Sequence, residues 1–295
     1  MKKRIGLVGN HAKPVIKKAA GQVVDFFRDK KNYELMVDSS LSHVLPNSPT
    51  KIIYELIPWS DLLIVLGGDG TLLSIVPYIS NDGPEVLAVN LGQLGFLTEF
   101  NPIALGAALE KWLKGQSSIR ERMLLEVSSD SKKNERHLVL NEAAVTKGSF
   151  SRILSLDVFV ADQHLTNYRC DGLIISTPTG STAYSLSSGG PIVEPELSLI
   201  LITPICPHTL SNRPLLVSDQ YEIKIVLRSD VDDAGLTLDG RKGMLVIPNE
   251  VISVCKAKEK LHLVQGENSF FKIVKEKLGW AGAMDKIYTN KKGRK

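Results

Sequence analysis

The chain has 295 residues, which suggests two domains or one large one at roughly 100–200 residues per domain. Hydrophobic residues make up 43% and charged residues 23%, and these ordinary values exclude a disordered or collagen-like chain. The net charge is +4, but residues 286–295 hold five basic side chains and no acid, so residues 1–285 carry +4 − 5 = −1. A basic face for DNA or RNA is therefore not indicated, and no nucleic-acid partner is expected.

The three cysteines, Cys170, Cys206 and Cys255, show neither zinc-ligand spacing nor the pattern of a secreted disulfide framework. The six histidines are scattered without ligand spacing, so no protein-built metal site is predicted. The apolar run Ile5–Val8 is too short for a signal sequence. No window approaches the ~18 apolar residues of a membrane span. We therefore predict a cytoplasmic protein with no membrane partner.

The first third of the chain alternates strand and helix patterns. In chain order we expect a strand at 5–8, a helix after Pro14, a weak strand at 35–37, a strand at 61–66, a helix at 72–79, a strand at 86–90 and a helix at 103–113. The run Asp61–Leu66 is almost wholly apolar, which is typical of a strand buried on both faces of a parallel sheet. This alternation predicts an α/β doubly wound domain over residues 1–115.

After about residue 116 the pattern changes to strands with few helices between them. The candidate strands are 123–127, 137–146, 154–160, 173–176, 221–227 and 245–247. The clearest is Tyr221–Leu227, where apolar and polar residues alternate as in a strand with one wet face. We predict a mostly-β domain over residues 116–265. Residues 266–295 form a C-terminal segment with enough apolar residues to dock, followed by the basic tail.

The first chemical motif is Gly67-Gly68-Asp69-Gly70-Thr71, which follows a buried strand and opens a helix. Its glycines let a ligand approach the backbone, and the N–H groups of the helix start favour an anion, which makes Gly67, Gly68, Gly70 and Thr71 candidate phosphate-binding residues. The motif is neither a Walker A loop nor a G-x-G-x-x-G fingerprint. Asp69 is either an ordinary helix cap or a general base for a hydroxyl nucleophile or a partner for Mg²⁺.

Two further motifs carry polar groups. Asp171–Ser185 contains a strand that ends at Ser176 and then a loop rich in hydroxyls, more than a helix cap at Ser181 or Thr182 would need. Tyr184 either stacks on a base or fills the core, and the residues alone favour the core. Asn141-Glu142 interrupts an apolar strand, and it is either a strand edge or bulge or a grip for a ribose diol, since carboxylate and amide oxygens accept hydroxyl protons.

In combination, these motifs resemble the NAD kinase family of the bacterial type. The matching segments are 67–71, 90–97, 141–142, 171–191, 203–210, 213–214 and 239–240, within about residues 5–280. The Gly-Gly-Asp-Gly-Thr motif is shared with phosphofructokinases and lipid kinases, whereas the run Thr177–Tyr184 singles out NAD kinases. A lipid or sugar kinase, or a non-catalytic dinucleotide-binding regulator, remains the alternative.

The resemblance implies that ATP phosphorylates the adenosine ribose 2′-hydroxyl of NAD to give NADP, with Asp69 as catalytic base. It also implies Mg²⁺, held largely by phosphates and water. The family fold is an α/β domain and a β-sandwich, with the final segment returning to the first domain. The partners implied are ATP, NAD and further copies of the chain, in a homodimer or homotetramer. ATP or polyphosphate as donor, and NAD or NADH as acceptor, stay open.

Within this resemblance, Asn141 and Glu142 hold the ribose, Asp171 contacts the nicotinamide side, and the stretch 182–187 binds the adenine region. The implied NAD-binding residues are Asp69, Gly70, Asn141, Glu142, Arg152, Arg169, Asp171, Thr179, Thr182, Ala183, Tyr184, Ser185, Ser187 and Arg241. The chain departs from the family at Arg241, where many members have Gln, and at Ser74, where several have His or Arg.

Overall fold

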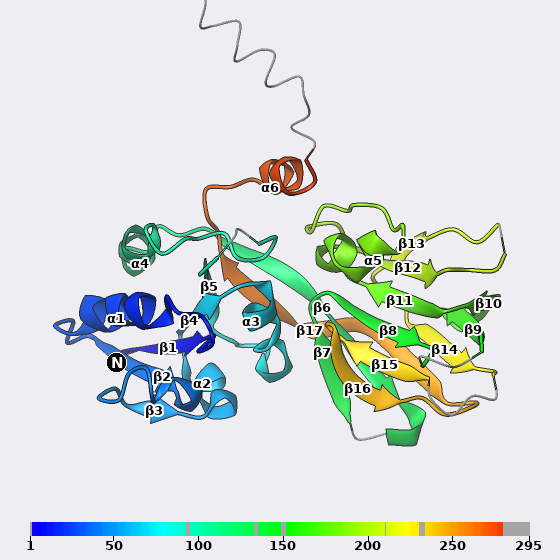
Figure 1. Ribbon diagram of the computed structural model, residues 1–295, viewed down its shortest axis with the longest axis horizontal. Coiled ribbons are helices and arrows are strands. Elements are labelled where there is room, and N and C mark those ends of the chain that lie inside the picture. The colour runs from blue at the N-terminus through cyan, green and yellow to red at the C-terminus, as the bar shows by residue number, and fades with distance from the viewer. Residues whose placement is uncertain are drawn as a thin grey trace, which may run out of the picture.

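The computed structural model describes residues 2–92, 95–132, 135–148, 152–209, 211–229 and 234–279, apart from the side chain of Lys242. An α/β half and a β-rich half lie side by side (Figure 1). Among the described residues no helix is long and apolar enough to cross a membrane.

The α/β half is built on a parallel sheet. Its strands are β1 (Lys3–Gly9), β2 (Tyr33–Asp38), β3 (Thr50–Lys51), β4 (Leu62–Gly67) and β5 (Glu85–Asn90), in the order β3-β2-β1-β4-β5. Its helices are α1 (Ile16–Phe27), α2 (Ile53–Trp59), α3 (Asp69–Leu73) and α4 (Leu105–Leu113), with 3₁₀ turns at Ser39–Leu41 and Val76–Tyr78. Helices α1 and α4 bury apolar residues on one face of the sheet, and α2 and α3 on the other. The predicted doubly wound fold is confirmed.

Two local features of this half differ from expectation. The helix predicted over 72–79 begins earlier, at Asp69, and ends at Leu73, because Pro77 lacks the N–H that a continuing helix needs and sits in a separate 3₁₀ turn. Helix α2 was not predicted, since it has only seven residues and contains Pro58 near its end.

The second half contains two sheets. Its strands are β6 (Ile119–Ser129), β7 (Arg136–Val139), β8 (Glu142–Thr146), β9 (Leu154–Val160), β10 (Gln163–Cys170), β11 (Gly172–Ser176), β12 (Leu199–Ile205), β13 (Leu215–Ser218), β14 (Ile223–Leu227), β15 (Gly235–Leu238), β16 (Arg241–Leu245) and β17 (Val251–Val264). One sheet has the order β13-β12-β11-β8-β15-β16, and the other contains β10, β9, β14, β17, β6 and β7. Alternate residues of β9 and β14 are buried between them. The expected mostly-β architecture is confirmed.

Strand β17 joins the two halves into one sheet. Its first residues pair with β14, as Ile223 with Val254, and its last residues pair in parallel with β5, as Leu263 with Val86. Strand β6 pairs antiparallel with β17 on the other side, along most of its length. In Figure 1 these two strands run from one half into the other. The position of the β-rich half relative to the glycine-rich turn is therefore set by ladder hydrogen bonds.

The segment after β17 contacts the first half and lies between the two (Figure 1). The Gly266 N–H donates to Glu99 Oε2 at 2.8 Å. Helix α6 (Phe270–Lys277) then begins at Ser269, whose hydroxyl accepts from the Lys272 N–H at 3.2 Å. A short helix, α5 (Tyr184–Ser187), and 3₁₀ turns at Asp130–Lys132 and Thr179–Thr182 complete the described elements. The basic tail lies outside the described residues.

Candidate active site

The glycine-rich turn lies where two neighbouring parallel strands end. Gly67 at the end of β4 is in register with Asn90 at the end of β5, so the loops that follow both strands meet at one edge of the sheet. A Cβ on Gly67 would lie 2.0 Å from Thr71 Oγ1, whereas a Cβ on Gly68 or Gly70 would meet nothing within 4 Å. The backbone at Gly68 and Gly70 is therefore open to a ligand.

Asp69 is held by the loop that follows β5. Its Oδ2 accepts the Phe96 N–H at 2.9 Å, and its Oδ1 accepts the Leu97 N–H at 3.2 Å and the Thr98 hydroxyl at 3.0 Å. A Cβ on Gly95 would lie 1.9 Å from Asp69 Oδ1, so this loop approaches the carboxylate without room for a side chain. A carboxylate offers about four acceptor positions, and one on Oδ2 is left over.

The ordinary interpretation of Asp69 as a helix cap is wrong. The N-cap of α3 is Gly68, and Asp69 is the first helical residue. Its carboxylate instead reaches across to the next strand's loop. There the Asn90 side-chain amide donates to Thr98 Oγ1 at 2.7 Å, which leaves the Thr98 proton for Asp69.

Asn141 lies between β7 and β8, and Glu142 is the first residue of β8; they are 8% and 4% exposed. Strand β8 is flanked by β11 and β15, so the strand-edge interpretation of this pair is wrong. The Tyr184 backbone N–H donates to the Glu142 carboxylate, but Glu142 Oε2 has no hydrogen-bond partner within the described part of the chain. Burial and the nearby Asp239 charge raise the pKa of Glu142 to about 7. This carboxyl therefore changes charge near neutral pH.

Two hydroxyls of the polar loop form hydrogen bonds inside the protein. The Ser181 hydroxyl accepts the Val193 N–H at 3.0 Å, and the Ser185 hydroxyl lies 2.9 Å from the Thr203 hydroxyl. Both serines are fully buried. The Ser185 hydroxyl, one of the predicted ligand groups, is thus engaged within the fold.

Two other hydroxyls of the same loop, those of Ser176 and Thr179, are buried without a partner in the described residues. Ser176 is in register with Glu142. Gly180, the residue after Thr179, packs against the Asn141 turn, since a Cβ on it would lie 2.1 Å from the Asn141 carbonyl oxygen. Buried hydroxyls without partners are uncommon and are explained by a water or a ligand. The loop therefore presents unused polar groups beside Asn141.

Tyr184 is 40% exposed, so the expectation that it fills the core is wrong. Ser187 is also exposed, while Thr182 and Ala183 are half-buried. These residues form the surface of the 3₁₀ turn and of α5.

The two polar centres adjoin at the junction of the halves. Phe96 and Leu97, whose N–H groups hold Asp69, line the same small cavity as Thr179 and Thr182. Ile273 of α6 also lines this cavity. The structure therefore brings the loop that holds Asp69 against the polar loop beside Asn141.

Asp171 lies apart from this junction. Gly172 is in register with Thr146 and Ser176 with Glu142, so Asp171 lies past the far end of β11, about 17 Å from Glu142 at ~3.4 Å per strand residue. There its carboxylate pairs with Lys147 Nζ at 2.8 Å. One ligand that touched both ends of the strand would have to span about this length.

The predicted arginines are all exposed. Neither Arg152 nor Arg169 forms an ion pair with a residue in the described ranges, and Arg169 is at the end of β10. Arg241 begins β16, two residues after Asp239. Burial raises the pKa of Asp239, and the charge of Arg241 opposes this only after the three backbone N–H groups that the carboxylate accepts.

Sequence reasoning missed three residues at these centres: Thr98, Thr177 and Asp239. Each followed or belonged to a motif that was recognised, since Thr98 follows the 90–97 segment, Thr177 begins the run Thr177–Tyr184 and Asp239 precedes Gly240. Their roles are hydrogen bonds to loops distant in sequence. These residues therefore lay in or beside recognised motifs, but the sequence did not show which distant loops they contact.

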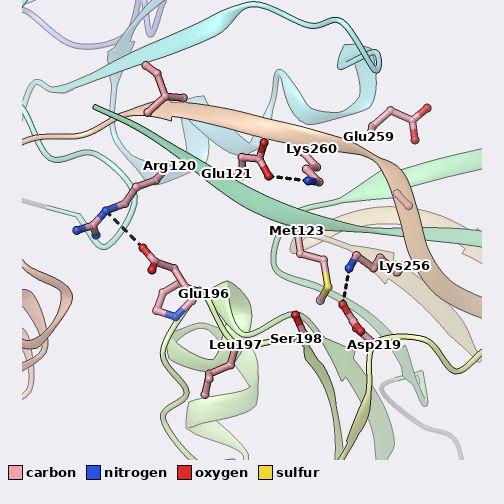
Figure 2. A pocket seen from close by; sticks show the side chains of 13 residues that line it. Arg120, Glu121, Met123, Glu196, Leu197, Ser198, Asp219, Lys256, Glu259 and Lys260 are labelled. Atoms are coloured by element: carbon pink, nitrogen blue, oxygen red, sulfur yellow. Dashed lines mark hydrogen bonds and ion pairs between the residues drawn. The ribbon is translucent and has the colours of Figure 1, made fainter. Parts of the chain in front are cut away.

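The cavity in Figure 2, of about 380 Å³, is a different place. Its charged groups are paired: Arg120 with Glu196 at 3.5 Å, Glu121 with Lys260 at 2.6 Å, and Lys256 with Asp219. Glu259 also lines the cavity and pairs with Arg136 outside it. None of the predicted site residues lines it. It is lined by compensated charge and does not belong to the predicted site.

Comparison with known proteins assigns the family. Residues 5–117 match the ATP-NAD kinase N-terminal domain and residues 140–266 match the ATP-NAD kinase C-terminal domain. A Moorella thermoacetica protein described as NAD kinase is 39% identical over 284 residues, 95% of this chain and 90% of that protein. The chain belongs to the ATP-NAD kinase family.

Other similar proteins and solved structures are also described as NAD or NADH kinases. An NAD kinase of Syntrophotalea carbinolica is 40% identical over 289 residues, 94% of this chain and 99% of that protein. The crystal structure of yeast NADH kinase complexed with NADH superposes with a TM-score of 0.88 at 28% identity, covering 96% of this chain and 89% of that one. An NAD kinase from Archaeoglobus fulgidus in complex with ATP gives 0.73 at 25% identity, covering 92% and 96%.

Proposed function

We propose that this protein transfers the γ-phosphoryl group of ATP to the adenosine ribose 2′-hydroxyl of NAD, producing NADP and ADP. Family membership supports the reaction. The observation that carries it to this chain is the junction where the loop holding Asp69 meets the polar loop beside Asn141 and Glu142. It combines a fixed carboxylate with buried polar groups that lack partners.

In this proposal Asp69 accepts the proton of the 2′-hydroxyl as that oxygen attacks the γ-phosphorus. Its three hydrogen bonds hold the carboxylate in one orientation and leave an acceptor position on Oδ2. Gly68 and Gly70 leave the adjacent backbone uncovered for phosphate oxygens. Phosphoryl transfer depends mainly on such positioning and on charge stabilisation.

The ribose is gripped by Asn141 and Glu142, whose oxygens accept hydroxyl protons. The unpartnered Glu142 Oε2 and Thr179 hydroxyl are the groups that a ribose would satisfy. The exposed Tyr184 ring offers a face for the adenine. Thr182, Ala183, Ser185 and Ser187 belong to the same turn, and Ser185 acts there through its backbone or its packing, because its hydroxyl bonds Thr203.

The nicotinamide side of the dinucleotide extends toward Asp171 in this proposal, consistent with the strand-length separation between Asp171 and Glu142. Arg152, Arg169 and Arg241 are the exposed cations available to the pyrophosphate or to ATP.

Mg²⁺ enters as part of the substrate, the Mg²⁺ complex of ATP. Within the described ranges no three His, Cys, Asp or Glu side chains gather as a metal site, and three of the acceptor positions of Asp69 are occupied by loop donors. This donor set fits an ion held by phosphates and water, as is usual for Mg²⁺ with nucleotides. The ion would neutralise charge on the β- and γ-phosphates.

A direct assay tests the proposal. The purified chain is incubated with ATP, Mg²⁺ and either NAD or NADH, and NADP(H) is followed with an NADP-specific coupled dehydrogenase. We expect product with at least one acceptor, and polyphosphate in place of ATP tests the donor. Absence of NADP(H) with both acceptors and both donors would overturn the proposal.

The oligomer and the location remain predictions. A homodimer or homotetramer, expected from the family, is measured by sedimentation equilibrium. The cytoplasmic location and the boundaries near residues 115 and 265 likewise stay predictions.

A further inference from the structure

The short turn that carries Asn141 and Glu142 has all of its peptide groups hydrogen-bonded. Leu140, Asn141 and Glu142 are buried, and their three N–H and three carbonyl groups all find partners. Only two residues, Asp239 and Thr177, supply these six contacts. Two distant segments thus hold one turn.

Asp239 provides four of the contacts. Its Oδ2 accepts the Leu140 N–H at 2.9 Å, and its Oδ1 accepts the N–H groups of Asn141 at 2.7 Å and Glu142 at 3.1 Å. Its own N–H donates to the Glu142 carbonyl oxygen at 2.9 Å. Hydrogen bonds to an ionised group are roughly twice as strong as neutral ones, so this carboxylate is the main anchor of the turn.

Thr177 provides the contacts from the other side. Its hydroxyl donates to the Leu140 carbonyl at 2.6 Å and accepts the Gly180 N–H at 3.0 Å. Its N–H donates to the Asn141 carbonyl oxygen at 2.9 Å. The polar loop and the turn are therefore held as one unit.

The β15–β16 hairpin explains why Asp239 reaches this place. Asp239 and Gly240 are its two loop residues, both with positive φ, +50° and +70°, as a type I′ turn requires. Strand β15 pairs with β8 through Leu238 and Ala143, so the turn lies beside the start of β8. Asp tolerates this backbone conformation, and Asn tolerates it equally well.

We propose that Asp239 is a positioning residue for NAD: it holds the backbone of residues 140–142 so that the Asn141 and Glu142 side chains face the ribose. This rests on the proposed function. Among the described residues the Asp239 carboxylate accepts hydrogen bonds from backbone N–H groups alone, and these occupy both of its oxygens. It acts through the two residues that it orients.

Asp239 also acts on Glu142 through its charge. The groups that face Glu142 are the Asp239 carboxylate and the Tyr184 N–H, and Arg241 faces Asp239. Burial comes first and the Asp239 charge second in raising the pKa of Glu142 to about 7, while the Tyr184 N–H lowers it. Removing the Asp239 charge therefore lowers the pKa of Glu142, an effect that a purely structural residue would not have.

The test compares Asp239→Asn with wild type in the NADP-forming assay over a range of pH. Asn keeps the turn conformation and can still accept from Asn141 and Glu142, but it loses the Leu140 contact and the charge. We expect KM for NAD to rise by about tenfold to a hundredfold, as for a displaced positioning group, with KM for ATP unchanged. The acid limb of kcat/KM for NAD moves to lower pH.

Thr177→Val separates backbone support from charge. It removes the hydroxyl contacts without removing a charge, so we expect a raised KM for NAD and an unshifted acid limb, with Thr177→Ser restoring KM. Asp219→Asn is the matched control, because Asp219 is a buried carboxylate of the same half that pairs with Lys256 at the cavity of Figure 2.

A folded Asp239→Asn protein with wild-type KM for NAD and an unmoved acid limb would overturn the inference. Should Asp239→Asn fail to fold, Thr177→Val decides, and an unchanged KM for NAD overturns it. If wild type forms no NADP(H), the proposed function fails on its own, and calorimetric NAD binding by the same variants still tests the positioning.

Discussion

At the scale of single residues, this site depends on two carboxylates in opposite environments. Asp69 accepts three hydrogen bonds, whereas Glu142 is buried with one oxygen unpartnered and a raised pKa. Burial favours the neutral form of a carboxyl group, and it is the main cause of the raised pKa of Glu142. In the proposed reaction the two groups have different tasks, Asp69 as a fixed proton acceptor and Glu142 as a ribose ligand.

Asp69→Asn tests the first task. The amide keeps the size of the side chain but is a far weaker base, so we expect kcat to fall by about 10²–10⁴-fold, the usual contribution of general base catalysis. KM for NAD should change little. The control is Asp82→Asn, an exposed residue of the same half. A variant with near-wild-type kcat would remove Asp69 as the base.

Glu142→Gln tests the second task through stability. Folding raises the pKa of Glu142 from 4.5 to about 7, so between these pH values the folded state keeps a proton that the unfolded state has lost. Wild-type stability therefore falls as pH rises through this window, by roughly 1–3 kcal/mol. Gln has no charge to bury. We expect the variant to gain stability relative to wild type between pH 5 and pH 8.

Urea unfolding at both pH values measures this difference, with the exposed Glu34→Gln as the control that shows none. The same substitution should weaken NAD binding, so stability and activity move in opposite directions. An equal stability difference at pH 5 and pH 8 would mean that the pKa of Glu142 is not raised by folding.

At the scale of elements, the site is made by loops at strand ends. The turn after β4 and the loop after β5 meet because Gly67 and Asn90 are in register. The Asn90 amide, the Thr98 hydroxyl and the Asp69 carboxylate form one hydrogen-bonded chain. The orientation of Asp69 is thus a property of two adjacent strands.

Thr98→Val breaks this chain with little change in shape. Thr98 is fully buried, so the loss leaves the Asn90 amide unpaired at a cost of about 1–3 kcal/mol. We expect a lower midpoint in thermal unfolding and a kcat reduced by about tenfold, equivalent to ~1.4 kcal/mol in the barrier. Thr98→Ser keeps the hydroxyl and should behave as wild type. A Val variant with unchanged kcat would show that this chain does not orient Asp69.

At the scale of the molecule, β17 makes the two halves one structure. It pairs with β14 of the second half and β5 of the first, and its Leu261 lies in a core that also contains Val65, Leu72 and Leu124. Residues of both halves therefore share buried surface. The proposed site lies at this junction and takes its two carboxylates from different halves, so it would depend on this rigidity.

Leu261→Ala tests this coupling. Leu261 is fully buried, and its truncation should cost about 2–5 kcal/mol. We expect hydrogen exchange to accelerate together in β1, β4, β9 and β14, since one cooperative unit is weakened. The exposed Leu165→Ala on β10 is the control. Faster exchange in only one half would show that the halves unfold independently.

Much of the α/β half was predictable because its signals are local. The run 61–66 and the helix over 103–113 appear within a residue or two of their predicted ends. The second half was harder. Strand β17 has fourteen residues and mixes buried and charged positions, because its two ends pair in different surroundings, so no single pattern marks it. Strands β10, β12, β13 and β15 were missed as well.

The residues of the candidate site were likewise predictable only in part. Short motifs identified Asp69, Asn141, Glu142 and the hydroxyl run. Carboxylates, amides and glycines seldom occur together in such motifs without a functional reason. Tyr184 was assigned to the core but is exposed. The sequence does not show whether an aromatic side chain beside a buried turn points inward or toward solvent. Asp239 had a motif but no role until its contacts with residues 140–142 were seen.

By itself, the sequence determined the family, the α/β-then-β order and the chemistry-bearing residue types, since these depend on local periodicity and on short motifs. It also assigned the excess positive charge to the last ten residues, which lie outside the described part of the chain. Only the tertiary structure decided which of these groups meet. The three donors that hold Asp69, the two residues that hold the Asn141 turn and the strand that joins the halves are contacts between segments 27 to 177 residues apart. Such contacts depend on sheet register, which no local pattern encodes.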